Sequence, residues 1–292
     1  SDVYKRQVYK IVTYILDHKH AQGLRSFSDQ LTDCVSLLKK RPAIIPYFSH
    51  VLVDEYQDVN SVQVELLTLL NVDNVFAVGD PRQAIYGWRG SDMKFMLDFE
   101  TSFGETETIH LVKNYRSAQK VVDVMNDAVR HMNLPDLLHH DDYSEMNSDV
   151  KLFSFDTDSA EREFVIQVVS TLLDTPESVF ILARTNRQVN ELSDVLKRKK
   201  IAHQVKTDES NGFNGNSNGN GKKEDSEEAK SKLVLATVHA IKGLEADTVF
   251  LIGANKDSFP CRASDHPVVE LIKDEKYDKF EEEKRIFYVG LS

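Results

Sequence analysis

Two adjacent acids, Asp54 and Glu55, follow a short apolar run over residues 51–53. We predict that this run is a buried parallel strand, which would place both acids at its carboxyl end. There, one carboxylate could hold Mg²⁺ beside a nucleotide, while the other could orient or deprotonate an attacking water. A solvated pair of acids at a strand end has the same sequence, so the pair alone does not decide between these interpretations.

A second polar turn follows the next apolar run, residues 75–78, and begins at Gly79. It carries a glutamine, two aromatic side chains and an arginine: Gln83, Tyr86, Trp88 and Arg89. Ends of adjacent parallel strands meet at one edge of a sheet, so Gln83 could contact a phosphate near the two acids. The aromatic rings offer faces to unstacked bases, worth about 1–3 kcal/mol per base. A core tryptophan is the alternative for Trp88, but a position between glycines and beside an arginine fits a core poorly.

In this order the two segments resemble motifs II and III of the UvrD/Rep/PcrA helicases of superfamily 1. The resemblance continues along the chain with segments similar to motifs IV, IVa, V and VI: residues 114–117, 182–186, 237–245 and 281–292. Six motifs in the family's order make a specific signal. It implies an ATP-dependent 3′–5′ DNA helicase or translocase acting in DNA repair or replication restart.

The resemblance also implies roles for individual residues at an ATP site. Asp54 would hold Mg²⁺, Glu55 would be the catalytic base, and Gln83 would sense the γ-phosphate. Tyr115 would stack on adenine, and Glu245 would contact the ribose or another part of the nucleotide. Arg116 would stabilise transition-state charge on the γ-phosphate, a contribution of about 10³ to 10⁵ in rate.

The resemblance further implies a path for single-stranded DNA. The residues expected to line it are Tyr86, Trp88, Arg89, Thr237 and His239. A satisfied structural histidine is the alternative for His239.

The expected fold class is α/β, with two RecA-like parallel-sheet domains, the first of them incomplete, and a helical N-terminal remnant. Residues 1–7 look like a translated adapter, and 8–46 are predicted to be helices of the 1B region, the second capped by Ser26 or Ser28. Residues 47–112 would form part of domain 1A and 113–292 domain 2A. We expect ATP to lie between the two domains, with the acids facing Arg116.

The expected strands are apolar runs, and the expected helices follow helical spacing or a capping residue. Strands are predicted at 51–53, 75–78, 108–112, 179–183, 233–237 and 248–252. Helices are predicted after Asn60 or Ser61, over 117–132 and over 188–198.

The sequence departs from the family in three places. It contains no GxxxxGK[ST] phosphate-binding loop, and it stops at Ser292, before the arginine that motif VI should supply. We therefore expect the polypeptide as written to have no significant ATPase activity. An Asn/Gly-rich polar stretch, 207–232, stands where relatives insert domain 2B, and we predict a disordered loop there.

Composition limits the remaining possibilities. The net charge of −11 argues mildly against a general phosphate-backbone binder but permits a local basic channel. Two distant cysteines, Cys34 and Cys261, suggest neither a disulfide framework nor a zinc site. With no apolar run of membrane-spanning length, we expect a soluble, cytoplasmic, nucleoid-associated protein that binds DNA and ATP, with unknown protein partners.

Two other functions remain open from the sequence. The chain could be the motor part of a RecB-like helicase–nuclease, which a nuclease domain would reveal. It could also be a non-catalytic DNA-binding remnant, although such a remnant should have lost Asp54, Glu55, Gln83 or Arg116.

Overall fold

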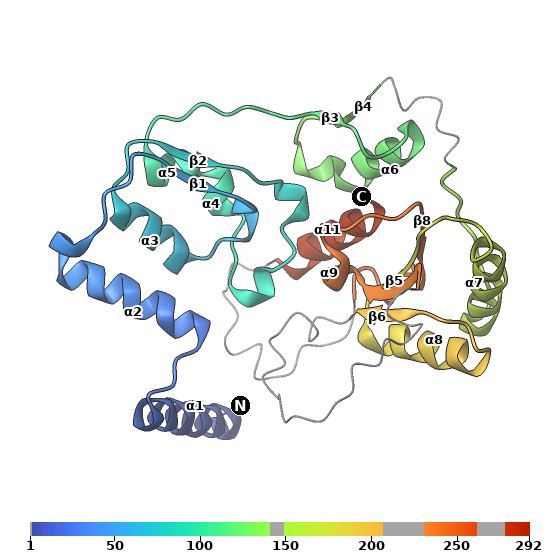
Figure 1. Cartoon of the computed structure of the whole chain (residues 1–292), viewed down its shortest axis with the longest axis horizontal. Coiled ribbons are helices and arrows are strands. Elements are labelled where there is room, and N and C mark those ends of the chain that lie inside the picture. The colour runs from blue at the N-terminus through green and yellow to red at the C-terminus, as the bar shows by residue number, and fades with distance from the viewer. Residues whose placement is uncertain (1, 141–148, 207–230, 262–277) are drawn as a thin grey trace. The chain divides into compact units, whose positions relative to one another are not determined.

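The computed structural model describes residues 2–140, 149–206, 231–261 and 278–292. The chain divides into two compact units. Unit 1 comprises Ser1–His110 and Ala263–Glu282, and unit 2 comprises Leu111–Arg262 and Glu283–Ser292. Each unit contains its own parallel strands (Figure 1).

Unit 1 opens with two helices, α1 (Asp2–Gln22) and α2 (Phe27–Lys40), followed by the short turn η1 (Pro42–Ile44). Ser26 caps α2: its Oγ accepts from Asp29 N at 3.2 Å, and the Asp29 carboxylate accepts from Ser26 N at 2.7 Å. This reciprocal pairing satisfies two backbone donors that a helix start otherwise leaves open, which selects Ser26 over Ser28 as the cap. Helix α1 includes residues 2–7, whose adapter origin stays a prediction.

The sheet of unit 1 pairs β1 (Val51–Val53) with β2 (Val75–Ala77) in parallel. Helix α3 (Ser61–Leu70) connects the strands and packs beside α2. Its cap is Asn60, one of the two predicted candidates: Asn60 Oδ1 accepts from Gln63 N at 3.0 Å, and Gln63 Oε1 accepts from Asn60 N at 2.9 Å.

Short elements follow each strand of unit 1. They are η2 (Tyr56–Asp58), η3 (Pro81–Gln83), η4 (Gly87–Arg89), α4 (Lys94–Leu97) and α5 (Phe99–Phe103). Tyr56, Val59 and Val64 form the buried core, against which Phe99 and other apolar side chains of α4 and α5 pack. The residue that follows the two acids therefore anchors the strand end in the core.

Unit 2 begins with a small parallel pair and a helix, and continues into a larger sheet. Its first elements are β3 (Lys113–Asn114), α6 (Gln119–Val129), η5 (Arg130–Met132) and β4 (Leu138–His139). Next come α7 (Asp158–Leu172), β5 (Val179–Ala183), α8 (Asn186–Arg198) and β6 (Gln204–Lys206). The last described elements are β7 (Leu233–Thr237), α9 (Val238–Ile241), β8 (Thr248–Leu251) and α11 (Lys279–Leu291), of which α11 starts in unit 1.

The larger sheet has the strand order β6-β7-β5-β8, and every neighbouring pair is parallel. Ile181 in β5 lies opposite Leu235 in β7 and Phe250 in β8. Side chains alternate between the two faces of a strand, so these three residues share one face.

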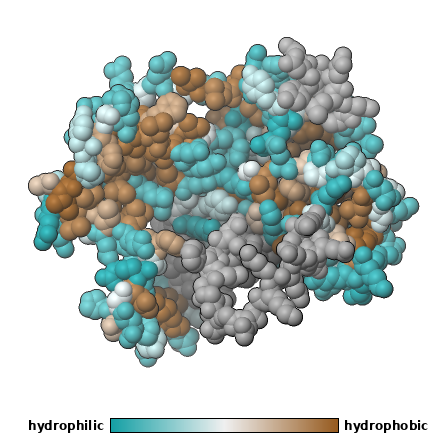
Figure 2. All heavy atoms as spheres, in the orientation of Figure 1, coloured by the Kyte–Doolittle hydropathy of each residue, from teal (hydrophilic) through white to brown (hydrophobic). Residues whose placement is uncertain are grey.

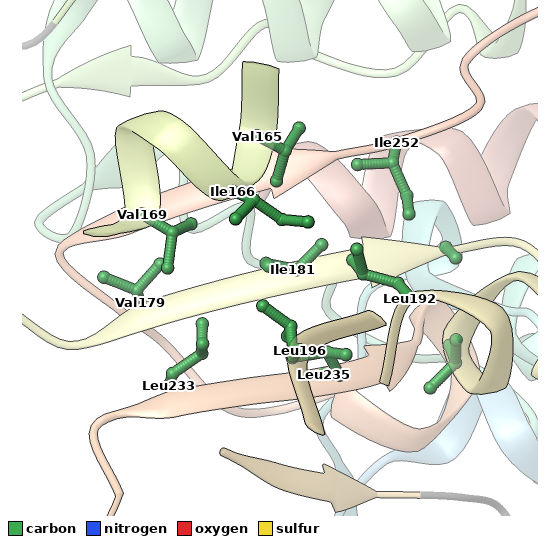
Figure 3. Close-up of a cluster of buried hydrophobic side chains, with 12 residues drawn as sticks. Val165, Ile166, Val169, Val179, Ile181, Leu192, Leu196, Leu233, Leu235 and Ile252 are labelled. Atoms are coloured by element: carbon green, nitrogen blue, oxygen red, sulfur yellow. The ribbon is translucent and has the colours of Figure 1, made fainter. Parts of the chain in front are cut away.

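Helices α7 and α8 pack over that face, where Figure 3 shows their side chains around β5. The cluster holds Val165, Ile166 and Val169 from α7, and Val189, Leu192 and Leu196 from α8. Ile181 and Leu235 lie beneath them, 1% and 0% exposed. The opposite face is also covered: a Cβ at Gly290 of α11 would lie 3.3 Å from Leu251 Cδ1 and 3.4 Å from Val238 Cγ2.

The predicted α/β fold class with parallel sheets is confirmed, but the strand predicted at 108–112 is wrong. Pairing starts only where Leu138 N donates to Val112 O at 2.8 Å, and β3 covers Lys113–Asn114. Ile109 and Leu111 are 70% and 83% exposed, so this apolar run lacks the covering layer that a buried strand needs. Most of the predicted 207–232 loop lies outside the described residues.

Candidate nucleotide and nucleic-acid sites

The two acids lie at the carboxyl end of β1, as predicted. Backbone bonds fix this strand end, because Val78 N donates to Val53 O at 2.8 Å and Tyr56 N donates to Val78 O at 2.9 Å. Asp54 and Glu55 are both exposed, and Asp54 Oδ1 accepts from Glu55 N at 2.9 Å. The carboxylates therefore lie at a hydrogen-bonded strand end and are open to solvent.

Glu55 has a left-handed backbone, with φ of 51°. A residue with a Cβ seldom adopts this conformation, and such strain costs on the order of 1 kcal/mol or more and often accompanies functional sites. The conformation turns the chain sharply after the strand, which sends Tyr56 into the core while Glu55 stays at the surface.

A hydrogen-bond network joins the ends of β1 and β2. Gln57 Nε2 donates to Glu55 Oε2 at 2.5 Å, and Gln57 Oε1 accepts from Asp80 N at 3.0 Å. Asp80 Oδ2 accepts in turn from Gln83 Nε2 at 3.2 Å. We call Glu55, Gln57, Asp80 and Gln83 the Gln57 network. It brings the predicted base and the predicted phosphate sensor into one bonded group.

The aromatic turn after η3 presents its rings at the surface. Trp88 is 49% exposed, so it is not a core tryptophan. The Arg89 guanidinium carbon lies 4.4 Å from the Trp88 ring centroid and 5.4 Å from that of Tyr86, within cation–π range. Within unit 1, Gly87 N also donates to Glu282 Oε2 at 2.8 Å. The turn thus combines an open aromatic face with positive charge.

Unit 2 brings together the predicted nucleotide contacts of motifs IV and V. Arg116 Nε lies 2.8 Å from Glu245 Oε2, with both side chains substantially exposed. Asn114 Oδ1 accepts from the backbone N–H groups of Arg116 at 2.9 Å and Ser117 at 2.8 Å, which shapes the turn. Tyr115 is 57% exposed, and its ring centroid lies 4.6 Å from that of His140. The three side chains predicted to contact the nucleotide therefore lie in unit 2. Tyr115 and Arg116 belong to one turn, and Glu245 is the ion-pair partner of Arg116.

Thr237 and His239 are buried, at 3% and 8% exposure. Thr237 ends β7 and caps α9, because its Oγ1 accepts from Ala240 N at 3.2 Å. The observed burial and capping are structural roles, and the predicted DNA contacts of these two residues stay a prediction.

Sequence reasoning missed a buried ion pair beside these motifs. Arg184 donates through Nε at 2.9 Å and through Nη2 at 2.5 Å to the two oxygens of Glu283, which is buried. The pairing joins the end of β5 to α11. The run of three glutamates, 281–283, gave no signal that Glu282 and Glu283 are buried and that Glu281 is not. Gln57 and Asp80 were also missed, because the sequence does not show that the ends of β1 and β2 are joined through these two residues.

The acids fit a Mg²⁺ ion that also binds water and phosphate. Among the described residues, no three His, Cys, Asp or Glu side chains form a group that could cage a metal. Mg²⁺ in phosphate-transfer sites is usually held by one or two carboxylates with several waters and substrate oxygens. An exposed Asp54 at a strand end suits that mode.

Across the described residues, no helix is both long and apolar enough to span a bilayer.

Comparison with known protein families decides the assignment. The UvrD/REP helicase N-terminal domain family matches residues 1–104, and the UvrD-like helicase C-terminal domain family matches residues 109–214 and 216–292. This chain belongs to the UvrD-like helicases. The predicted resemblance to the UvrD/Rep/PcrA helicases is thereby confirmed.

Individual relatives of this UvrD-like chain are DNA helicases by name. It is 27% identical to "ATP-dependent DNA helicase PcrA" of Leuconostoc citreum over 218 residues, covering 70% of this chain and 29% of the relative. It is 28% identical over 287 residues to "Probable DNA helicase" of Mycoplasma pneumoniae, covering 92% and 47%. With PcrA of Staphylococcus aureus strain Mu50 it shares 30% over 188 residues, covering 61% and 26%. The chain thus spans about a quarter to a half of these relatives' length.

Proposed function

We propose that this UvrD-like chain forms part of the motor of an ATP-dependent DNA helicase that moves 3′ to 5′ on single-stranded DNA in repair or replication restart. The observation that carries the proposal is the Gln57 network. It holds a carboxylate and a glutamine at neighbouring strand ends, where parallel α/β sheets commonly bind ligands. Polarity and pathway follow from the family resemblance.

In the complete motor, unit 1 would contribute a Mg²⁺ ligand, the base and a γ-phosphate contact. Asp54 would hold Mg²⁺, which when bound neutralises phosphate charge. Glu55 would accept the proton of the attacking water, and its exposure leaves room for that water. Gln83 would contact the γ-phosphate.

Unit 2 would contribute the remaining nucleotide contacts. Tyr115 would stack on adenine with its exposed ring, and Glu245 would accept from the ribose or another part of the nucleotide. Arg116 would stabilise charge on the γ-phosphate. Exposed ion pairs contribute only about 0–1 kcal/mol to stability. The Arg116–Glu245 pair is therefore weak enough for the guanidinium to leave Glu245 and bind a phosphate.

The aromatic turn of unit 1 would contact DNA bases. Tyr86 and Trp88 offer stacking surfaces, and Arg89 offers charge to the phosphates. Since Gln83 lies only three residues before Tyr86, a change at the phosphate end of the turn would move the base contacts with it.

Trp88 provides a direct test, because it is the only tryptophan in the chain. We expect oligo-dT to quench its fluorescence saturably and in a salt-dependent way. By anisotropy of labelled DNA, Trp88→Ala should weaken binding by about 1–3 kcal/mol, roughly five- to 150-fold in Kd. Tyr47→Ala is the matched control, an aromatic in the same unit that is 91% exposed and lies outside the turn.

Equal loss in both variants, or no quenching at saturating DNA, would overturn the assignment of the aromatic turn. The nucleotide contacts are tested separately. A fluorescent ATP analogue with Mg²⁺ should bind the chain, and Tyr115→Ala should weaken that binding while leaving oligo-dT binding unchanged.

A further inference from the structure

Gln57 stands out in the acidic segment because it is buried. It is 1% exposed, whereas the neighbouring Asp54 and Glu55 are both exposed. A buried amide is costly unless its donors and acceptor find partners. No contact with nucleotide, metal or DNA is assigned to this side chain above, so its protein partners are informative.

The orientation of the Gln57 amide is set by chemistry. Its nitrogen faces two carboxylates, Glu55 at 2.5 Å and Asp58 at 3.5 Å, and its oxygen faces the backbone N–H of Asp80 at 3.0 Å. Flipping the amide would set an oxygen against carboxylates and an NH₂ group against an N–H. Only one orientation satisfies every partner.

Space around Gln57 is also restricted. A Cβ at Gly79 would lie 2.4 Å from Gln57 Oε1, and 3.0 Å from its backbone nitrogen. Only glycine therefore permits the end of β2 to approach the amide this closely. Gly79 and Gln57, 22 residues apart in the sequence, therefore form a close contact that a larger side chain at position 79 would block.

We propose that Gln57 is the positioning residue of the motor site: it holds the Glu55 carboxylate in place and ties it to the segment that carries Gln83. This inference rests on the proposed function, in which Glu55 is the base and Gln83 the phosphate sensor. Gln57 itself touches neither substrate nor metal.

The physical effect is pre-organisation. An exposed glutamate samples several rotamers, and a hydrogen bond from a buried amide to its ionised oxygen favours one of them. The same amide accepts from Asp80, whose carboxylate binds Gln83 Nε2. A displacement of Gln83 is thereby transmitted through three consecutive hydrogen bonds to Glu55.

The test reads the Gln57 side-chain NH₂ signals by NMR in the full 292-residue chain labelled with [¹⁵N]glutamine. We expect these protons to exchange with solvent at least about ten-fold more slowly than those of Gln119, which donates to Asp123 at 2.7 Å on an exposed helix surface. Glu55→Ala should shift the Gln57 signals and also those of Gln83. Glu55 is exposed, so this variant leaves the core untouched.

Asp123→Ala is the matched control, since it removes the same kind of amide–carboxylate bond and should move only the Gln119 signals. A second variant, Gln57→Met, should speed exchange of the Asp80 N–H and shift Gln83. If Gln57→Met fails to fold, the Glu55→Ala arm still decides. The proposal would be overturned if Glu55→Ala left the Gln57 side-chain signals unshifted, or if the Gln57 NH₂ protons exchanged with solvent as fast as those of Gln119.

Failure of the wider function is distinguishable in the same samples. Adding Mg²⁺ with a non-hydrolysable ATP analogue should shift the backbone signals of Asp54 and Glu55 if the site binds nucleotide. A coupled Gln57 network without such shifts would contradict the nucleotide site and leave the Gln57–Glu55 bond standing. Shifts without coupling would contradict Gln57 as the positioning residue and leave the nucleotide site standing.

Discussion

The sheets of the two units are built from similar apolar strands, yet they are covered differently. In unit 2, Ile181 and Leu235 lie side by side and are almost wholly buried under α7 and α8. In unit 1, Leu52 and Phe76 also lie side by side, but they are 74% and 58% exposed. Figure 2 shows apolar surface over the β1–β2 part of unit 1.

Within this polypeptide, the two units are therefore stabilised by different means. Burying a large apolar side chain contributes about 1.5–3 kcal/mol to the free energy of unfolding. Ile181 and Leu235 make this contribution, whereas the exposed Leu52 and Phe76 largely do not. Unit 1 instead holds its functional strand ends with the Gln57 network and the small core around Tyr56. We infer that unit 2 is the more stable framework and that unit 1 opens more readily.

The largest expected effect comes from matched leucine substitutions at the middle of a strand. Leu235→Ala should lower the free energy of unfolding by about 2–5 kcal/mol, because it leaves a cavity in a closed core. Leu52→Ala should change it by no more than about 0.5 kcal/mol. Urea unfolding followed by far-UV circular dichroism measures both. Equal losses would show that the two sheets are covered alike and would break the comparison.

A smaller effect is expected at the buried ion pair of unit 2. Glu283→Ala should cost about 2–3 kcal/mol, because it leaves the guanidinium of Arg184 without its carboxylate in a mostly buried place. Glu191→Ala, which removes a carboxylate from exposed ion pairs in the same unit, should cost less than about 1 kcal/mol. Thermal unfolding of both variants separates them. A Glu283→Ala protein as stable as Glu191→Ala would mean that the pair contributes nothing to the closed framework.

The smallest effect concerns the core of unit 1. Among the described residues, the buried Tyr56 hydroxyl has no hydrogen-bond partner, so Tyr56→Phe should stabilise unit 1 by about 1 kcal/mol. Burial raises the pKa of Tyr56 above its ordinary value. A raised folded pKa gives stability that is present below the unfolded value, about 10, and is lost as pH rises through the folded pKa.

The wild-type unit should therefore weaken in alkali, and Tyr56→Phe should weaken less. Trp88 fluorescence during urea unfolding at pH 8 and at pH values above 10 follows unit 1, since that unit holds the only tryptophan. Tyr47→Phe, at a 91% exposed tyrosine, is the control and should behave as wild type. A Tyr56→Phe protein with lower stability would reveal a partner for the hydroxyl and sharpen the description of this core.

The sequence by itself determined the local elements of this protein. The strands at 51–53, 179–183 and 233–237 lie where their apolar runs predicted, and the caps at Ser26 and Asn60 follow from side chains that satisfy nearby backbone donors. Asp54 and Glu55 could be placed at a strand end for the same reason. These features depend on neighbours within a few residues, which the linear pattern records.

Only the tertiary structure decided which apolar runs become covered and which polar groups meet. The run at 108–112 resembled a buried strand but obtained no covering layer. His239 is buried, and the sequence alone left open whether it is a DNA contact or a structural histidine. Gln57 meets Asp80 across 23 residues, and Arg184 meets Glu283 across 99. Such contacts depend on which strands become neighbours, which a single sequence does not state. The expectation that the acids face Arg116 stays a prediction, because each of those groups is described within its own unit.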